Sequence, residues 1–480
     1  MGESIMKRYD YGTDRWKIIC GNYSGMERRA VELIYGRVSQ EVPYILVAQT
    51  ADQCGEKQDD NLILVGTRKS NPLIARLVGE SEIPQGGYLV KVADSPFCGG
   101  RQVAVIAGSN AACVHYGATD FVDDYLASAK LTDQYSPFFQ KLFQGRMKSY
   151  RSAGAPQVAR RGIWTWGHCI YDYRRFAATM ARLRLNQIVI WNDYAPLNLR
   201  EAVECFHSYG IRVIFGYSWG WDEKINVTSE EELERWAEKV LAVYRRDYAQ
   251  AGGDGIYFQS FTETKEETMN GVPIADAVTR WVNFIGGRLL EHYPELTIQF
   301  GLHATSVKNR VQVLAGIRPE IDIVWEDCGS FPYDYLPENI QDFESTKAFT
   351  EQILNLRPGC PCGVVLKGQI CLDWSIFEHQ KGPFVMGCES QAKIEKRMEK
   401  AREIWHFVQS GWFRNGRLCQ EIIRMLCEGG AEVNALVEDG LLESKCWFPV
   451  ALYAQMLWDC TEDFDGIVKR VSQRENVVMA

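Results

Sequence analysis

The sequence lacks the marks of several common classes of protein. None of its windows reaches the uninterrupted apolar length of about 20 residues that a membrane-spanning helix needs. Residues 1–10 contain no apolar signal-peptide core. The net charge of −9 is the opposite of the basic balance that nucleic-acid-binding proteins carry. We therefore expect a cytoplasmic protein with no membrane and no nucleic-acid partner.

Motifs for metals and cofactors are missing as well. The chain has only 7 histidines, no HExxH and no CxxC, so the ligand sets of common zinc sites are absent. Gly66 and Gly108 each end an apolar run, but neither belongs to a GxGxxG motif or to a phosphate loop with its lysine. The 15 cysteines are scattered, with Cys360 and Cys362 the closest pair, and we interpret them as free thiols in a reducing compartment. We expect neither a cofactor nor a bound metal.

What the sequence does contain is enough apolar residues for large cores. A hydrophobic content of 46% over 480 residues predicts two or three domains. Residues 61–66, 87–92 and 102–108 have the composition of strands, and residues 26–38 have the periodicity of an amphipathic helix. We assign residues 1–155 to a small α/β domain with its linker, and this domain shows no catalytic constellation.

From Arg161 onward, strand-like runs alternate with amphipathic helices. Eight such units in roughly 230 residues match the length and rhythm of a (β/α)8 barrel, with a doubly wound sheet as the alternative. The predicted strands cover residues 162–166, 187–193, 212–217, 256–261, 296–301, 321–327, 363–368 and 384–389. The fold class is therefore α/β, a (β/α)8 TIM barrel over residues 156–390, preceded by the small α/β domain.

Residues 391–480 are predicted to form a C-terminal helical region. Helical periodicity covers residues 394–408, 418–436 and 449–458. The aromatic residues at its end favour packing against the barrel, and the alternatives are that they line a cleft or form a contact between two copies of the chain. These aromatic residues are Trp447, Trp458 and Phe464. A homodimer is therefore a possible assembly.

Residues 252–263 contain the candidate catalytic acid on which the functional prediction depends. Glycines and Asp254 form a turn, an apolar run follows, and the run ends in Thr262 and Glu263. In a parallel barrel the carboxyl ends of the strands meet at the face where catalysis takes place. We therefore interpret Glu263 as a functional acid, against the alternative of a solvated glutamate that merely starts a loop.

The predicted strand ends collect carboxylates and aromatic rings at one face. Paired carboxylates can serve as proton donor and as nucleophile or base, and aromatic rings can stack on sugar rings, so this set is typical of glycoside hydrolysis. Neither a Ser–His–Asp order nor a metal-ligand motif competes with it. The residues at this face are Trp164, Trp166, Asn192, Asp193, Tyr217, Trp219, Asp222, Glu263, His303, Glu326, Asp327, Lys367, Asp373 and Trp374.

The start of the predicted barrel resembles that of family 20 glycoside hydrolases, the β-N-acetylhexosaminidases. Those enzymes begin the barrel with Arg-Gly, a helix ending in a Leu-Asn turn, a strand ending in Asp, and a helix ending in Gly-Ile. The small domain before the barrel is similar to one that family 67 α-glucuronidases share. The stretches that carry the resemblance are residues 161–163, 173–176, 180–186, 190–193 and 207–214.

The resemblance implies roles for particular residues. Arg161 would hold hydroxyls of the sugar, Glu263 would be the acid at the end of strand four, and Trp374 would wall the sugar pocket. Family 20 has an aspartate directly before its acid, whereas this chain has Thr262. The second carboxylate is then expected on strand six, as Asp327 or Glu326.

The sequence thus predicts an exo-acting glycoside hydrolase with a carbohydrate substrate. Glu263 is the general acid, and Asp327 or Glu326 is the base or nucleophile. One alternative is a catalytically degenerate barrel that only binds carbohydrate. A second alternative is a lyase or metal-assisted hydrolase that uses Asp193, Asp222 and His303.

Overall fold

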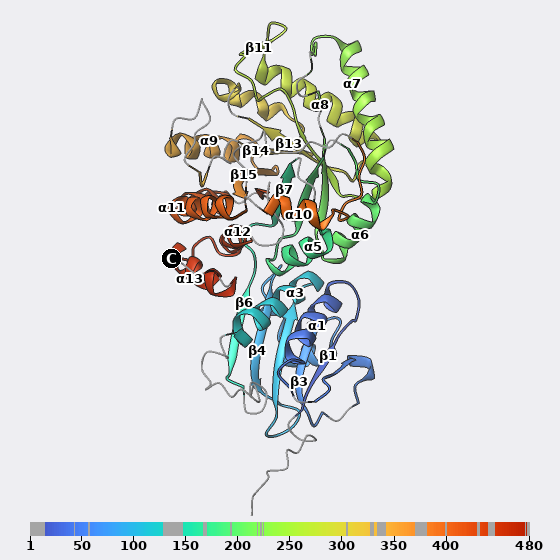
Figure 1. The fold of residues 1–480 in the computed structure, drawn as a ribbon, viewed down its shortest axis with the longest axis vertical. Helices are drawn as coiled ribbons and strands as arrows, with labels where there is room; N and C mark the ends of the chain where they lie inside the picture. Colours follow the sequence, from blue (N-terminus) through green and yellow to red (C-terminus); the bar gives the residue numbers. More distant parts are fainter. Residues whose placement is uncertain are drawn as a thin grey trace, which may run out of the picture. The chain divides into compact units, whose positions relative to one another are not determined.

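The computed structural model describes two compact units, Met1–Pro156 and Gln157–Ala480 (Figure 1). We describe each unit by itself. None of the helices in the described part of the chain is both long and apolar enough to span a membrane, and its cysteines are free thiols, as predicted. The described residues are 15–477 except 43, 56–57, 128–146, 167–169, 193, 218, 221–222, 224, 304–305, 327–330, 334–341, 370–381, 399–400, 430–432, 440–446 and 476.

The first unit is a mixed six-stranded sheet in the order β2-β1-β3-β5-β4-β6. The apolar runs predicted as strands form β3, β4 and β5, and the predicted helix is α1. Buried aliphatic side chains such as Ile19, Leu64 and Val105 form the core beneath the helices. The bounds are β1 Trp16–Cys20, α1 Gly25–Val38, β2 Val47–Thr50, η1 Ala51–Gln53, β3 Asn61–Thr67, α2 Pro72–Leu77, η2 Glu80–Glu82, β4 Tyr88–Asp94, β5 Gln102–Gly108, α3 Ala111–Thr119, η3 Asp120–Leu126 and β6 Tyr150–Gly154.

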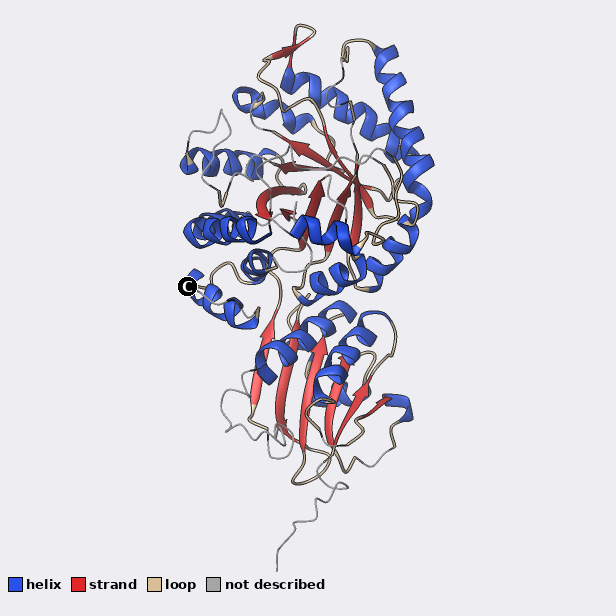
Figure 2. Cartoon of the chain, viewed as in Figure 1, coloured by secondary structure: helices blue, strands red, loops and turns tan. Residues whose placement is uncertain are grey.

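The second unit contains a closed barrel of eight parallel strands, which confirms the predicted fold class. Helices surround the ring of strands (Figure 2). Around the ring the order is β10-β13-β14-β15-β16-β7-β8-β9. The strands are β7 Arg160–Trp166, β8 Gln187–Trp191, β9 Arg212–Gly216, β10 Gly255–Gln259, β13 Thr297–Leu302, β14 Ile321–Trp325, β15 Cys362–Gln369 and β16 Val433–Asp439, with a small ribbon of β11 Thr268–Met269 and β12 Val272–Pro273.

Four helices of this unit, α5, α7, α9 and α13, begin at a short polar residue whose side chain caps them. The side chain of Asp172 accepts the Arg175 N–H at the start of α5, and Ser229 accepts the Glu232 N–H at the start of α7. The helices are α5 Tyr173–Arg182, α6 Leu199–Ser208, α7 Glu230–Val243, η4 Tyr244–Tyr248, η5 Ala249–Ala251, α8 Ile274–His292, η6 Lys308–Gly316, α9 Phe343–Leu356, α10 Gln391–Met398, α11 Ala401–Glu428, α12 Phe448–Trp458 and α13 Phe464–Arg474.

The eighth strand lies elsewhere than predicted. Residues 384–389 form no strand. Their backbone bonds to the loop after β8, because Phe384 C=O accepts from Leu197 and the Asn198 side chain bonds both backbone groups of Met386. The barrel is closed instead by β16, which pairs with β15 and β7. A helix predicted over residues 418–436 therefore ends at Glu428, and the stretch after residue 391 supplies a barrel strand as well as helices.

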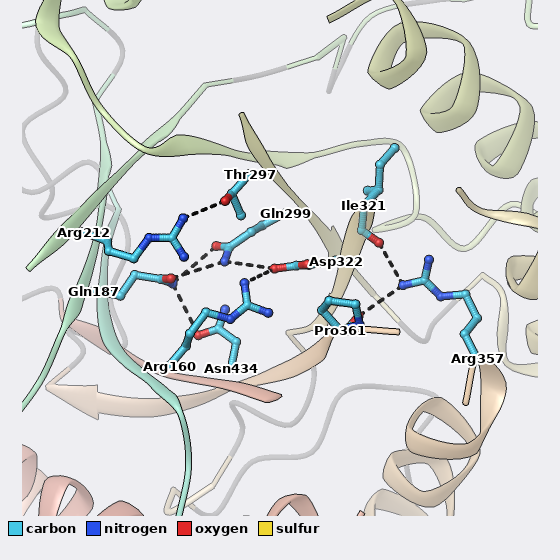
Figure 3. A network of polar contacts seen from close by, with 10 residues as sticks. All are labelled: Arg160, Gln187, Arg212, Thr297, Gln299, Ile321, Asp322, Arg357, Pro361 and Asn434. Carbon is cyan, nitrogen blue, oxygen red and sulfur yellow. Dashed lines mark hydrogen bonds and ion pairs between the residues drawn. The ribbon is translucent and has the colours of Figure 1, made fainter. Parts of the chain in front are cut away.

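Polar side chains fill the barrel at the N-terminal ends of its strands (Figure 3). Arg160 forms a buried ion pair with Asp322. Gln187 contacts Gln299 and Asn434, and all three side chains are fully buried. Above this layer the interior is packed with apolar and aromatic side chains, Trp164, Val189, Trp191, Ile214, Tyr257, Val324, Val365 and Leu436. The barrel is thus a filled core, and only its C-terminal face is left for a ligand.

Candidate active site

A buried carboxylate stands at the C-terminal end of β14. Glu326 follows the strand directly and is only 6% exposed. Its Oε1 accepts a hydrogen bond of 2.8 Å from the hydroxyl of Tyr257, and its Oε2 accepts one from the side-chain amide of Gln259. His303 Nε2 lies 3.1 Å from the same Oε2. Both oxygens therefore face donor groups, which suits a carboxylate that acts only as an acceptor.

The second carboxylate, Glu263, shares the imidazole of His303. Its Oε2 lies 3.9 Å from His303 Nε2, and its side chain is about half exposed, at 53%. Because one nitrogen contacts both acids, the sum of the two distances to it is the upper limit for the separation of the two Oε2 atoms. The predicted proton donor and a strand-six carboxylate are thus close neighbours, which is what a two-carboxylate reaction requires.

The strand register explains why these groups meet. Side chains of a strand alternate between its two faces, so Tyr257 and Gln259 of β10 point to the same side. Gly301 of β13 pairs with Gln259 and leaves the space that Glu326 occupies. A Cβ at Gly301 would lie 1.9 Å from Glu326 Oε1 and 2.9 Å from the Tyr257 hydroxyl oxygen. Glycine is therefore required here by close approach of a neighbouring side chain.

Thr262, which directly precedes Glu263, forms hydrogen bonds with the loop after β13 that carries His303. Its fully buried side chain accepts a 3.2 Å hydrogen bond from the His303 backbone N–H. Its carbonyl accepts a 2.6 Å hydrogen bond from the Ser306 hydroxyl. The residue that stands where family 20 has an aspartate thus holds the β13 loop in place, next to Glu263.

Aromatic rings form the floor beneath this cluster. Trp164 lies 5.5 Å from Tyr257 between ring centroids, and Trp191 lies 6.1 Å from Tyr257. Gly216 gives Trp191 its room, since a Cβ there would lie 2.6 Å from the indole. The three rings are almost fully buried. Trp164 and Trp191 therefore orient Tyr257 by packing against it, and they leave no open face on which a sugar could stack.

Three of the residues predicted at the site have other environments. The Arg161 guanidinium is buried and donates to the carbonyl oxygens of Arg184, Val158 and Ala159, at 3.0, 2.8 and 2.8 Å. It lies at the start of β7, far along the strand from the C-terminal end, and its donors are used by the backbone. The expected contact of Arg161 with sugar hydroxyls is therefore not supported by this geometry.

Tyr217 and Trp219 pack outside the barrel. The Tyr217 ring stacks on Tyr248 at 5.2 Å, and Trp219 stacks on Phe258 at 3.6 Å. Both are buried, and burial raises the pKa of Tyr217 well above its usual range. These rings belong to the core between strands and helices, so the aromatic count of the sequence overstated the number of sugar platforms.

The remaining predicted residues divide by what the structure describes. The structure brings Glu263, His303 and Glu326 together, and it buries Asn192 at the end of β8. Lys367 and Trp166 lie on β15 and β7, with side chains outside the described set. Asp193, Asp222, Asp327, Asp373 and Trp374 lie outside the described residues.

Sequence reasoning missed the partners of Glu326. The sequence pattern assigns Tyr257 and Gln259 to an apolar strand and Gly301 to a strand end, without a role at the site. A signal for them exists: Gln259 is a polar residue two positions after Tyr257 in a strand otherwise apolar, which marks one polar face.

Within the described part of the chain, groups of three or more His, Cys, Asp or Glu side chains placed to hold a metal ion are absent.

Comparison with known proteins yields likeness in fold only. Neither a protein-family model nor a curated protein matches the sequence. The chain is similar to a GH138 enzyme targeting pectin rhamnogalacturonan II, with a TM-score of 0.54, 10% sequence identity, and coverage of 96% of this chain and 54% of the other. It also matches a family GH115 4-O-methyl-α-glucuronidase with specificity for decorated arabinogalactans, with a TM-score of 0.48, 14% identity, and coverage of 96% and 59%.

The chain therefore spans little more than half the length of these two structures. These two structures are glycoside hydrolases with a barrel. At 10% identity the likeness to the GH138 enzyme shows a shared fold alone. The narrower resemblance to families 20 and 67 is not confirmed by it.

Proposed function

We propose that this protein is a glycoside hydrolase in which Glu263 is the general acid and Glu326 is the carboxylate partner. One observation carries the proposal: both carboxylates contact the same imidazole, His303, at the C-terminal face of the barrel. Of the two strand-six candidates we propose Glu326, because its oxygens accept from Tyr257 and Gln259 and lie 3.1 Å from His303 Nε2.

The two carboxylates have the contrasting environments that the reaction needs. Glu326 is held by donors on both oxygens, which fixes its direction and suits attack on an anomeric carbon. Glu263 is half exposed, so it can give a proton to the leaving oxygen and regain one from water. Two acids in unlike surroundings commonly divide into donor and partner in this way.

The spacing supports retention of configuration. Retaining enzymes place the two carboxyl groups about 5–5.5 Å apart, and inverting enzymes about 6.5–9.5 Å. The distances of 3.9 Å and 3.1 Å to His303 Nε2 limit the separation of the two Oε2 atoms to the sum of the two. This limit allows the whole range of the retaining enzymes and only the shortest separations of the inverting enzymes. Glu326 is then the nucleophile, and Glu263 acts first as acid and later as base. The resemblance to family 20 supports exo-action on a chain end.

The test is turnover of aryl glycosides by folded variants. We expect Glu326→Gln to lose about 10³-fold or more in kcat on every substrate that the wild type cleaves, because it removes the nucleophile. Glu263→Gln should lose about 10²–10⁴-fold on poor leaving groups, and much less on dinitrophenyl glycosides, which need no proton. Glu295→Gln, an exposed residue in the turn before β13, is the matched control.

The outcome distinguishes the proposed mechanism from its alternatives. Wild-type turnover in Glu326→Gln would remove the residue from the reaction. An inverted product, seen by NMR immediately after cleavage, would make Glu326 a base instead of a nucleophile. Sugar binding without hydrolysis across the panel would favour the degenerate carbohydrate-binding barrel.

A further inference from the structure

A groove in the first unit lies outside the site described above. It has a volume of about 540 Å³ and runs between α1 and the edge strand β2, with the end of β1 as its base. Volumes of about 300–1,000 Å³ are usual for small-molecule sites. Its walls are mainly apolar, formed by residues such as Val31 and Ala48.

Two tyrosines on the groove are exposed to solvent. Tyr23, just before α1, is 53% exposed, and Tyr35, near the end of α1, is 37% exposed. Both line the groove. Large aromatic rings exposed on a folded surface are informative, because their burial would stabilise the fold. The Arg28 guanidinium carbon lies 5.5 Å from the centroid of the Tyr23 ring, so a ring-shaped ligand would stack on Tyr35 and on the other face of Tyr23.

The polar groups of the groove add hydrogen bonds without a net charge. Glu32 is the one carboxylate among the lining residues. Its oxygens lie 2.7 Å from Arg28 Nε and 3.2 Å from Arg29 Nη1, so its charge is compensated. Gln49, Thr50 and Gln53 contribute amide and hydroxyl groups at the same wall. A neutral ligand with many hydroxyls matches this lining better than an ion does.

One wall of the groove is an edge of the sheet. β2 is the last strand of the sheet and pairs with β1 alone among the described strands. A chain-like ligand can therefore enter from the side and extend past both tyrosines, whereas a closed pocket would admit only a monomer.

We propose that this groove binds an oligosaccharide chain, as a glycan-holding site separate from the barrel. The proposal rests on the proposed function for its choice of ligand class. Pyranose rings combine apolar C–H faces, which stack on tyrosine, with hydroxyl groups, which amides and compensated carboxylates bind. Holding a polymer at this groove would keep it attached to the enzyme between cleavage events.

The experiment is affinity electrophoresis of the full chain in native gels that contain arabinogalactan, xylan or rhamnogalacturonan. We expect at least one polysaccharide to retard the wild type. The double variant Tyr23→Ala/Tyr35→Ala should bind that polysaccharide about tenfold more weakly, since loss of two stacking contacts is worth at least 1.4 kcal/mol. Tyr35→Phe keeps the ring and should bind within twofold of wild type.

Ile45→Ala is the matched control. Ile45 is 86% exposed in the same unit but does not line the groove. All variants should keep the melting temperature of the wild type, because the truncated rings are outside the core. Turnover of a small aryl glycoside should be unchanged in all of them, since that substrate does not reach the groove.

Three results overturn the proposal. They are retardation by none of the polysaccharides, equal retardation of the double variant and wild type, and binding of an unfolded polypeptide such as casein in place of glycans. Failure of the proposed function is read separately: retardation that depends on the tyrosines, with no aryl glycoside cleaved, leaves a glycan-binding groove on a protein that is not a hydrolase.

Discussion

The hydroxyl of Tyr257 donates a 2.8 Å hydrogen bond to Oε1 of Glu326, across 69 positions of sequence. Tyr257 is fully buried and packed between Trp164 and Trp191, so its hydroxyl has one direction available. A rigid donor of this kind holds a carboxylate for reaction before substrate arrives. The contact thus links the aromatic interior of the barrel to the chemistry at its face.

Removal of this hydroxyl should slow catalysis. We expect Tyr257→Phe to lower kcat about 10- to 100-fold, because a buried charged acceptor loses a partner worth roughly 1.5–3 kcal/mol. The change in KM should be small, and steady-state kinetics on an aryl glycoside measures both. Tyr173→Phe is the matched control, since Tyr173 is equally buried but donates to Glu201. An unchanged kcat in Tyr257→Phe would contradict a positioning role.

Gly301→Ala should displace Glu326, the proposed nucleophile, without unfolding the barrel. The added Cβ would lie 1.9 Å from Glu326 Oε1, so the side chain of Glu326 must turn away. We expect kcat to fall at least about 10-fold, because small misplacements of a reacting group are costly. Gly99→Ala, where a Cβ would meet nothing within 4 Å, should behave as wild type. A crystal structure of Gly301→Ala with Glu326 unmoved would disprove the explanation.

Arg161→Lys separates a structural role from a sugar-binding role. The guanidinium donates to three backbone carbonyls, which a single ammonium group cannot reach with the same geometry. We expect the free energy of unfolding to fall by about 2 kcal/mol, with KM unchanged. Urea unfolding and kinetics together decide the matter: a raised KM with unchanged stability would restore the role that the family 20 resemblance implies.

The pair His207 and Asp254 makes stability depend on pH. His207 Nε2 lies 2.9 Å from Asp254 Oδ2. The hydrogen bond with Asp254 raises the pKa of His207 above 6.5. Burial alone would raise the pKa of Asp254, but hydrogen bonds from His207 and the Val213 N–H hold it below 3.8.

The sign of the effect follows from these two directions. The contribution of His207 is complete below pH 6.5 and is lost as pH rises through its folded-state pKa. The contribution of Asp254 is present above pH 3.8 and is lost as pH falls through its lowered pKa. Asp254→Asn should therefore destabilise the protein more at mildly acidic than at alkaline pH, and NMR titration should show the pKa of His207 lowered. Asp276→Asn, which breaks a pair with Arg310, should show no such pH dependence.

Much of the architecture could be predicted because the barrel strands are short apolar runs at even spacing. The site followed from one geometric rule: carboxyl ends of parallel strands converge. That rule alone placed Glu263, His303 and Glu326 together, although they come from three different strands.

The rest depends on contacts that a single sequence does not display. Trp219 looks like a platform residue until its stacking partner Phe258 is known. Arg161 has the charge of a ligand-binding residue, but backbone carbonyls take its donors. The strand Val433–Asp439 escaped prediction because the long helix α11 runs up to within a few residues of it, and its apolar residues continue the helical pattern.

The position of β16 in the chain has a consequence for biosynthesis. This strand joins β15 to β7, the last and the first of the other seven barrel strands to be made. A ribosome releases the chain from its N-terminus, so β7 and β15 emerge with unpaired edges and stay so while α10 and α11 are translated. Unpaired strand edges recruit other chains, and we expect molecular chaperones to engage the nascent polypeptide most strongly during that interval.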